Sequence, residues 1–357
     1  MEPARRAAGY GLQTVWSIFT PLAVAANAVN LGQGFPDLPV EEFVKEAVRR
    51  AINNDAVNQY APSRGRASLL KELAVDYSRD FGFIINQDEN ILVTLGANQG
   101  IFVTLQSFVN PGDKVLLFEP YFDIYKPSVQ ICGGEIVTYC LQGPDWTVDF
   151  EKVEKTIVEN KVKLVIFNTP HNPTGKIFTS QELNDFAEII RKHNLLVISD
   201  EVYDELYYNN DDLTRPTRLA SLPDMFDHVL TVGSAGKRFG VTWWRIVWLI
   251  GQQGILRTIT AVHARTVFSA PSPLQEACAE ALSIARQTGY FEKMRRVYKA
   301  KRDYLARVFD RIGIQYSLPM GGYFMMANSK NIQFPQDLAV REWDEFPGLK
   351  EPVDYQR

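Results

Sequence analysis

The sequence predicts an α/β fold, in which a largely parallel sheet lies between helices and a second, smaller domain follows it. Short apolar runs alternate with helical patterns through the middle of the chain. These runs are apolar almost without interruption, as expected for strands that are buried on both faces. After Pro271 the alternation stops and long amphipathic helical patterns take over. Alternating strands and helices are typical of parallel sheets, so the large domain belongs to that class.

Each strand of the expected sheet ends at a polar or Gly-rich turn. The expected strands are Ile91–Leu95, Lys114–Phe118, Leu164–Phe167, Leu195–Ser199, Val229–Val232 and Trp244–Ile250. Helices are expected between them, for example over Asn98–Phe108 and Ser180–His193. In the second of these, Leu183, Phe186 and Ile190 recur at helical spacing.

The end of the chain has a different pattern and predicts a small α+β domain. Helices are expected over Ser272–Arg286 and Gly289–Ile312, and short strands over Gln315–Ser317 and Tyr323–Ala327. We therefore divide the chain into three parts. Residues 1–40 form an N-terminal segment that packs on the body and the active site, residues 41–285 form the large domain, and residues 286–357 form the small one.

Composition excludes several classes of protein. The 357 residues carry 38 Lys and Arg against 42 Asp and Glu, so no strong positive field attracts nucleic acid or an anionic membrane. Hydrophobic residues make up 46% and charged residues 22%, a balance typical of packed globular proteins. No apolar run is long enough for a membrane span, and no secretory signal is recognisable. A cytoplasmic location is expected, with a mitochondrial one as the alternative.

The three cysteines and four histidines show no metal-binding spacing, so no metal site is expected. Cys132, Cys140 and Cys278 are expected to be buried free thiols.

Reactive side chains follow several of the expected strands, at the edge where open α/β sheets bind ligands. A small-residue turn, Gly96-Ala97-Asn98, opens a helix whose free N–H groups could hold a phosphate. Asn172 comes shortly after the expected strand Leu164–Phe167. Each residue also has an ordinary interpretation, because Asn172 precedes Pro173 and suits a turn.

Two further strands end in residues that could be reactive. Asp200 directly follows the expected strand Leu195–Ser199, and Tyr203 comes three residues later. Lys237 comes after the expected strand Val229–Val232. Asp200 could instead be a helix N-cap, and Lys237 a solvated surface lysine. The convergence of all these groups on one edge favours a common site.

Two nucleotide-binding motifs are excluded by their spacing. Gly233 lies too close to the Gly236-Lys237 pair for a P-loop, and Arg238 stands where Ser or Thr is needed. Gly32-Gln33-Gly34 lacks the third glycine of a dinucleotide fingerprint, and Pro36 would interrupt the helix start.

Pyridoxal 5′-phosphate (PLP) suits this set of groups. Its phosphate needs a helix N-terminus, its aldehyde a lysine, and its ring nitrogen an anionic partner that keeps the nitrogen protonated. Asn and Tyr donors near the ring oxygen would tune the bond to the lysine, which can also act as a general base.

The chain resembles class I/II aminotransferases of fold type I, most closely the fungal kynurenine aminotransferases, which are relatives of glutamine transaminase K and cysteine-conjugate β-lyase. The matching stretches are VNLGQGFPD (29–37), NQYAPSRGR (58–66), VTLGANQGI (93–101), FEPYFDIY (118–125), NTPHNPTGK (168–176), SDEVYDELYY (199–208), TVGSAGKRF (231–239) and SAPSPLQEACAEAL (269–282). The resemblance implies a mainly parallel, seven-stranded sheet between helices, and a smaller α+β domain that is incomplete here.

The resemblance also implies a role for individual residues. Lys237 would form the Schiff base, Asp200 would pair with the pyridine nitrogen, and Asn172 and Tyr203 would bond the ring oxygen. Further cofactor contacts would come from Phe122 stacking on the ring and from Ala97, Asn98, Ser234 and Arg245 around the phosphate. Tyr60 would reach the phosphate of the partner subunit, which implies a homodimer. Trp16 and Gly34 would lie on the substrate side.

The sequence departs from the family pattern at two glycines. The pattern Thr-Gly-Trp-Arg-x-Gly-Trp reads here Thr-Trp-Trp-Arg-Ile-Val-Trp over residues 242–248. Trp243 and Val247 thus replace glycines, and extra bulk in a packed site typically costs about 1–3 kcal/mol. A left-handed backbone position would also be lost if either glycine needed one.

The end of the sequence differs as well. The stretch from Arg341 to Arg357 is polar and turn-rich, and the family continues beyond it. The continuation holds the arginine that grips the substrate α-carboxylate in a bidentate pair. We therefore expect a nearly complete cofactor site and an incomplete substrate site.

The implied activity is transfer of the amino group of an aromatic or sulfur-containing L-amino acid to a 2-oxo acid. Two alternatives remain open. One is PLP-dependent C–S β-elimination through the same lysine, and the other is a truncated, catalytically impaired paralogue that serves as a dimer partner.

Overall fold

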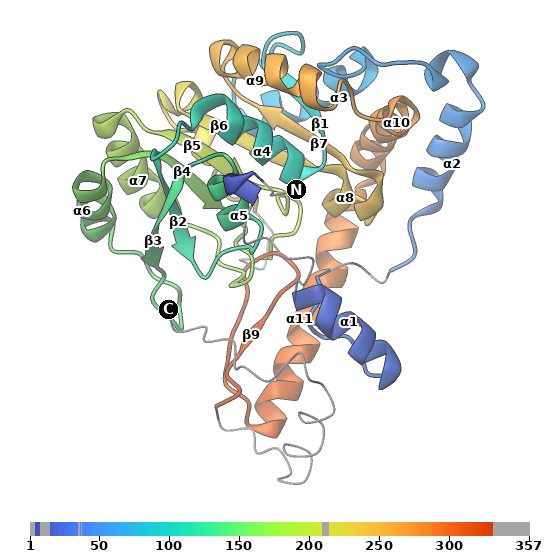
Figure 1. Cartoon of the computed structure of the whole chain (residues 1–357). Helices are drawn as coiled ribbons and strands as arrows, with labels where there is room; N and C mark the ends of the chain where they lie inside the picture. Colours follow the sequence, from blue (N-terminus) through green and yellow to red (C-terminus); the bar gives the residue numbers. More distant parts are fainter. Residues whose placement is uncertain (1–3, 8–14, 35, 37, 209–213, 331–357) are drawn as a thin grey trace.

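A seven-stranded sheet lies at the centre of the molecule, between two layers of helices (Figure 1). The computed structural model describes residues 4–7, 15–34, 36, 38–208 and 214–330. The strands are β1 (Ile91–Leu95), β2 (Lys114–Glu119), β3 (Glu135–Cys140), β4 (Val162–Asn168), β5 (Leu196–Asp200), β6 (Val229–Ser234) and β7 (Ile246–Ile250).

The sheet order is β1-β7-β6-β5-β4-β2-β3, and β7 runs antiparallel to both of its neighbours. The pairs from β6 to β3 are all parallel. The predicted α/β class with a mainly parallel sheet is confirmed. Because β1, β2, β4, β5 and β6 all point the same way, their carboxyl ends meet at one edge.

Helices cover both faces of the sheet and make two hydrophobic cores. One core contains residues of α3 (Ala67–Phe81), α6 (Phe150–Asn160), α7 (Ser180–His193) and α10 (Ser272–Thr288). The other contains residues of α4 (Ala97–Phe108), α5 (Tyr125–Ile131) and α9 (Gln253–Thr266). Within β4, Val165 and Phe167 face the first core and Leu164 and Ile166 the second. This alternation explains why the strand sequences are continuously apolar.

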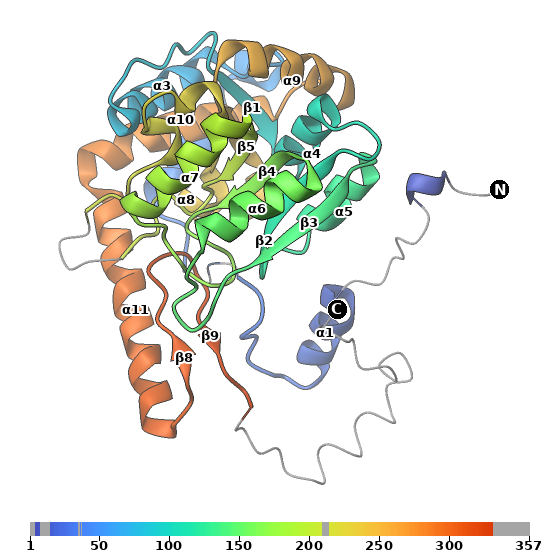
Figure 2. The ribbon, with the colours of Figure 1, turned by 90° about the vertical axis from the view of Figure 1, so that its left-hand side faces the viewer.

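The remaining elements lie outside this sandwich. α2 (Glu42–Ile52) packs on α10, and α11 (Tyr290–Ile312) extends away from the sheet layers in both ribbon views (Figures 1 and 2). The short strands β8 (Tyr316–Ser317) and β9 (Met326–Ala327) pair antiparallel. The other elements are α1 (Val15–Ala25), α8 (Ala235–Arg238) and the 3₁₀ turns Arg5–Ala7, Asp55–Asn58, Leu219–Ser221, Met225–Asp227 and Thr242–Trp244.

The sequence pattern missed β3 because this strand is only partly buried. Its residues are mostly half-buried, so Glu135–Cys140 shows no continuous apolar run. The predicted start of β7 at Trp244 is also wrong. Arg245 has a left-handed backbone (φ 57°), which ends the Thr242–Trp244 turn and delays the strand until Ile246.

Three other strands also begin later than predicted, and one of them is β8, which starts at Tyr316 and not at Gln315. The N–H of Leu195 donates to the carbonyl of Ile190 and closes the end of α7, so β5 starts one residue on. β9 is limited to Met326 and Ala327. The predicted C-terminal stretch from Arg341 to Arg357 lies outside the described residues.

The cysteines differ in exposure from the prediction. All three are free thiols, but Cys278 alone is buried, whereas Cys132 is half-buried and Cys140 is exposed. Within the described part of the chain, none of the helices has the length and hydropathy needed to cross a membrane.

Candidate active site

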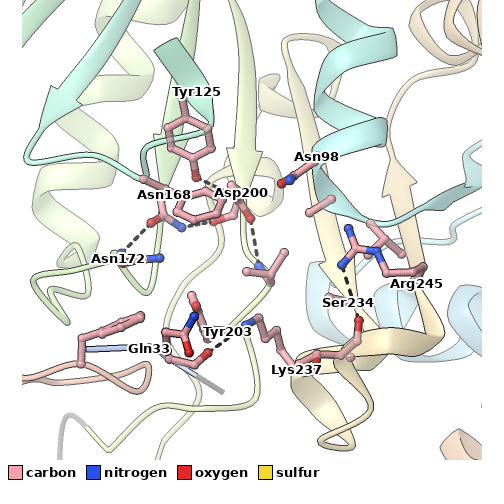
Figure 3. Close-up of a pocket in the computed structure, with 18 of the residues that line it drawn as sticks. Gln33, Asn98, Tyr125, Asn168, Asn172, Asp200, Tyr203, Ser234, Lys237 and Arg245 are labelled. Atoms are coloured by element: carbon pink, nitrogen blue, oxygen red, sulfur yellow. Dashed lines mark hydrogen bonds between the residues drawn. The ribbon is translucent and has the colours of Figure 1, made fainter. Parts of the chain in front are cut away.

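A pocket of about 310 Å³ lies at the carboxyl edge of the sheet (Figure 3). All but one of the residues predicted for the site line it: Trp16, Gly34, Ala97, Asn98, Phe122, Asn172, Asp200, Tyr203, Ser234, Lys237 and Arg245. They come from segments far apart in the sequence, and the parallel strands bring them together because their ends share one edge.

Lys237 follows β6 and lies on the one-turn helix α8, with its ammonium group directed into the pocket (Figure 3). Its Nζ lies 5.2 Å from the ring centre of Tyr203 and 3.5 Å from the carbonyl oxygen of Gly34. Burial lowers the pKa of Lys237 to about 8, although the charge of Asp200 opposes the shift. A neutral amine is therefore accessible near physiological pH.

Asp200 ends β5 and is held by two donors. The hydroxyl of Tyr125 donates to Oδ2 at 2.6 Å, and the backbone N–H of Val202 donates to Oδ1 at 3.3 Å. Burial raises the pKa of Asp200, while both hydrogen bonds and the charge of Lys237 oppose that rise. The carboxyl is thus a buried group for which a cationic ligand atom would be a favourable partner.

The turn after β4 carries two asparagines with different tasks. Asn168 donates from Nδ2 to the carbonyl of Asp200 at 2.7 Å and accepts the backbone N–H of Asn172 at 2.6 Å. Asn168 therefore joins the ends of two adjacent strands. Asn172 and Tyr203 both line the pocket.

The turn between β1 and α4 has the chemistry that suits an anion. Ala97, Asn98 and Gln99 begin α4, and the first backbone N–H groups of a helix have no partner within it. Ser234 and the guanidinium of Arg245 line the same pocket. Gly96 is left-handed (φ 88°), and a Cβ atom there would overlap the guanidinium of Arg245. This glycine lets the cation approach the helix N-terminus.

Aromatic side chains line the rest of the pocket. Trp16 comes from α1, Phe122 from the segment after β2, and Phe324 from the turn before β9. Phe324 lies directly against Gly34, where a Cβ atom would overlap its ring. The N-terminal and C-terminal parts of the described chain therefore meet over the pocket.

Tyr60 is the one predicted site residue that the structure does not bring to the pocket. Its side chain is 86% exposed, and its ring contacts the ring of Phe268 at a centroid distance of 5.4 Å. This position leaves Tyr60 available to a neighbouring subunit, and its predicted role across a dimer stays a prediction.

The two glycine replacements lie differently with respect to the pocket. The side chain of Trp243 is 90% exposed and does not line the pocket. Val247 is buried within β7, lines the pocket and pairs with Thr94 and Ser234. Neither residue has a positive φ, so no left-handed position is lost at them.

Sequence reasoning missed several lining residues, above all Tyr125, Asn168 and Phe324. Asn168 could have been found, because it directly follows the predicted strand Leu164–Phe167. Tyr125 lies in a helix of seven residues, and nothing in its sequence context indicates that its hydroxyl meets Asp200. The residues that the structure describes contain no group of His, Cys, Asp and Glu side chains suited to hold a metal.

The sheet edge thus brings together a helix N-terminus, the lysine Lys237 and the buried aspartate Asp200. This combination is typical of aminotransferases. A family model described as aminotransferase class I and II matches residues 26–342, and the chain belongs to this family. It is therefore an enzyme that moves an amino group from an amino acid to a 2-oxo acid.

Individual relatives give a more detailed comparison. The chain is 42% identical over 349 residues to the probable kynurenine–oxoglutarate transaminase of Saccharomyces cerevisiae, covering 92% of this chain and 78% of that protein. It is 36% identical to the kynurenine–oxoglutarate transaminase of Dictyostelium discoideum, covering 96% and 84%.

Solved structures agree with this assignment. The crystal structure of Bna3p from S. cerevisiae matches with a TM-score of 0.88 and 40% identity, over 94% of this chain and 82% of that one. The N-succinyldiaminopimelate aminotransferase of Mycobacterium tuberculosis matches with a TM-score of 0.87 and 32% identity, over 96% and 88%.

Proposed function

We propose that the protein is a PLP-dependent transaminase that takes the amino group of kynurenine or a similar aromatic L-amino acid and gives it to a 2-oxo acid such as 2-oxoglutarate. The observation that carries the cofactor assignment is the meeting of Lys237, Asp200 and the N-terminus of α4 in one pocket. The names of the relatives support the substrate class.

The groups of the pocket fit PLP in chemistry. A phosphate would accept the free N–H groups at the start of α4 and the positive charge of Arg245. A protonated ring nitrogen would offset the burial that raises the pKa of Asp200. Asn172 and Tyr203 offer an amide and a hydroxyl for the ring oxygen, and Phe122 offers an aromatic face. The roles of these residues are part of the proposal.

When bound, PLP supplies an aldehyde for the amine and a ring that accepts electrons from the substrate α-carbon. Lys237 would hold the cofactor through its amine, and its Nζ could then accept and return a proton as the general base. Its lowered pKa would make this exchange of a proton possible near neutral pH. Asp200 would favour a protonated ring nitrogen, and the hydrogen bond from Tyr125 holds the carboxyl of Asp200 in place.

The aromatic lining supports an aromatic substrate side chain. Trp16, Phe122 and Phe324 present flat apolar surfaces, on which an aromatic ring can stack. Among the residues that line the described pocket, Lys237 and Arg245 are the cationic ones, and both are assigned to the cofactor.

Purified protein with added PLP tests the proposal. Wild type should show the visible absorbance band of lysine-bound cofactor and transfer the amino group of L-kynurenine to 2-oxoglutarate. Lys237→Ala should lose both. An unchanged spectrum in Lys237→Ala would refute the cofactor assignment. Release of pyruvate from a cysteine conjugate, without amino transfer, would replace transamination by β-elimination.

We further propose that the enzyme works as a homodimer in which Tyr60 reaches the phosphate of the neighbouring subunit. Two observations support this arrangement. Tyr60 and Phe268 are exposed, and every other predicted site residue lines the pocket. The division into parts 1–40, 41–285 and 286–357 also stays a prediction.

A further inference from the structure

Three residues that line the pocket are each followed in the sequence by a charged residue that points away from it. Glu201 follows Asp200, Asp204 follows Tyr203, and Arg238 follows Lys237. These three followers are buried, with exposed fractions of 3%, 7% and 1%. All three belong to one set of ion pairs behind the pocket, which we call the buried ion network: Asp76, Asp80, Glu201, Asp204, Arg218 and Arg238.

Arg238 is the member of the buried ion network that directly follows Lys237, and it binds two of the acids. Its Nε and Nη2 donate to the two oxygens of Asp204 at 3.1 and 2.5 Å, and its Nη1 donates to Asp76 at 3.2 Å. The guanidinium also lies 5.1 Å from the ring centre of Trp248. A bidentate pair of this kind fixes orientation as well as distance.

Arg218 links Glu201 and Asp80 to Asp204, the acid that Arg238 also binds. Its Nη2 donates to Asp204 at 2.9 Å and to Asp80 at 3.0 Å, and its Nη1 donates to Glu201 at 2.6 Å. Ser199 donates to the second oxygen of Glu201 at 2.8 Å. Although burial alone raises the pKa of Asp204, Arg238 and Arg218 hold it below its ordinary value. Asp204 is thus an ionised hub between β5 and α8.

We propose that the buried ion network fixes the relative positions of Asp200, Tyr203 and Lys237, with Arg238 as the principal positioning residue. The inference rests on the proposed function, because those three side chains are the ones assigned to the cofactor. Each of them is one peptide unit from a side chain that the network holds. A displacement at Arg238 therefore moves the backbone that carries Lys237.

A matched pair of variants separates positioning from simple stabilisation. Arg238→Met removes the guanidinium beside Lys237 while leaving Asp204 paired with Arg218 and Asp76 paired with Arg286. The control, Arg286→Met, removes an arginine that also bonds Asp76 but touches none of the residues next to the pocket. Both variants lose buried charge pairs, so both should unfold at a lower temperature.

Only Arg238→Met should alter the site itself. We expect its dissociation constant for PLP to rise about 10-fold or more, since misplacement by about 1 Å can cost about 100-fold in function. The pH midpoint of the visible band of lysine-bound PLP should also shift, whereas Arg286→Met should keep its dissociation constant for PLP within about twofold of wild type and its pH midpoint unchanged. Arg238→Lys keeps the charge but cannot form the bidentate pair with Asp204, so its PLP affinity should lie between those of wild type and Arg238→Met.

Equal PLP affinity and equal spectral midpoints in Arg238→Met and Arg286→Met would overturn the inference and leave the network a purely structural feature. If Arg238→Met does not fold, the same comparison is made with Arg238→Lys. If wild type itself forms no visible band with PLP, the proposed function fails, and this inference fails with it.

Discussion

The lowered pKa of Lys237 determines when this side chain can attack an aldehyde. The amine has an ordinary pKa of 10.5, and burial lowers it to about 8. Below pH 8 the ammonium form dominates, and the neutral fraction falls about tenfold for each further pH unit. We expect the rate of PLP capture by the cofactor-free protein to rise with pH up to about 8 and then level off. Stopped-flow absorbance at several pH values measures this, and a rise that continues to pH 10 would contradict it.

Tyr125 gives a second prediction for a single side chain. Tyr125→Phe removes the hydroxyl that donates to Asp200 at 2.6 Å and leaves a buried carboxylate oxygen without that partner. A hydrogen bond to a charged group is worth about 1.5–3 kcal/mol, so PLP affinity should fall roughly 10- to 100-fold. Absorbance titration with PLP measures the change.

Tyr139→Phe is a suitable control for Tyr125→Phe. The hydroxyl of Tyr139 accepts the backbone N–H of Asp149 at 2.8 Å, away from the pocket. Its loss should affect stability but not PLP binding. If the two variants bind PLP equally well, the role assigned to Tyr125 is wrong.

Among the structural elements, the turn from β1 into α4 offers the clearest test. Gly96→Ala would strain a left-handed backbone and push against the guanidinium of Arg245. Gly82→Ala also places an alanine at a positive φ (79°), but its ψ of 10° is that of the ordinary left-handed region, and no atom lies within 4 Å of the added methyl group. Gly96 has a ψ of 159°, a combination that is essentially restricted to glycine. Gly82→Ala should therefore lose about 1 kcal/mol of stability from backbone strain, and Gly96→Ala should lose more. Only Gly96→Ala should also weaken PLP binding, as followed by titration alongside thermal unfolding; equal weakening in both would argue against a phosphate site at this turn.

How much could be predicted from sequence varies between elements. Strands such as β1 and β6 are buried along almost their whole length, and their apolar runs revealed them almost to the residue. The edge strand β3 was not found, because a half-buried strand shows only weak alternation. The start of β7 depended on the backbone angle of Arg245, which residue type does not reveal.

The residues of the site also differ in how well the sequence predicts them. Residues at strand ends, such as Asp200 and Lys237, could be placed in one pocket because the strand direction was predictable. Tyr125 and Phe324 reach the pocket from a short helix and a turn, whose positions depend on packing between distant parts of the chain. The exposure of Trp243 was unpredictable for the same reason, since its sequence neighbours are buried or half-buried.

For the whole molecule, the homodimer predicts complementation between two defective subunits. Lys237→Ala lacks the amine, and Tyr60→Ala lacks the hydroxyl offered to the neighbour. A hybrid of the two has one site with both groups intact. Co-expression with two affinity tags should therefore yield hybrids that regain the visible PLP band at about half of their sites, if each site draws Tyr60 from across the interface. Hybrids that bind no more PLP than the mean of the two parents would contradict a shared site.

The outward-facing indole of Trp243 has an optical consequence. It lies on the same short turn as Thr242, which lines the pocket, whereas Trp248 is fully buried in the sheet. A solvent-facing indole emits at longer wavelength than an enclosed one and is quenched by dissolved iodide. The residue that replaces a family glycine thus equips the enzyme with its own fluorescent reporter on the turn beside the pocket, which can be followed without any added dye.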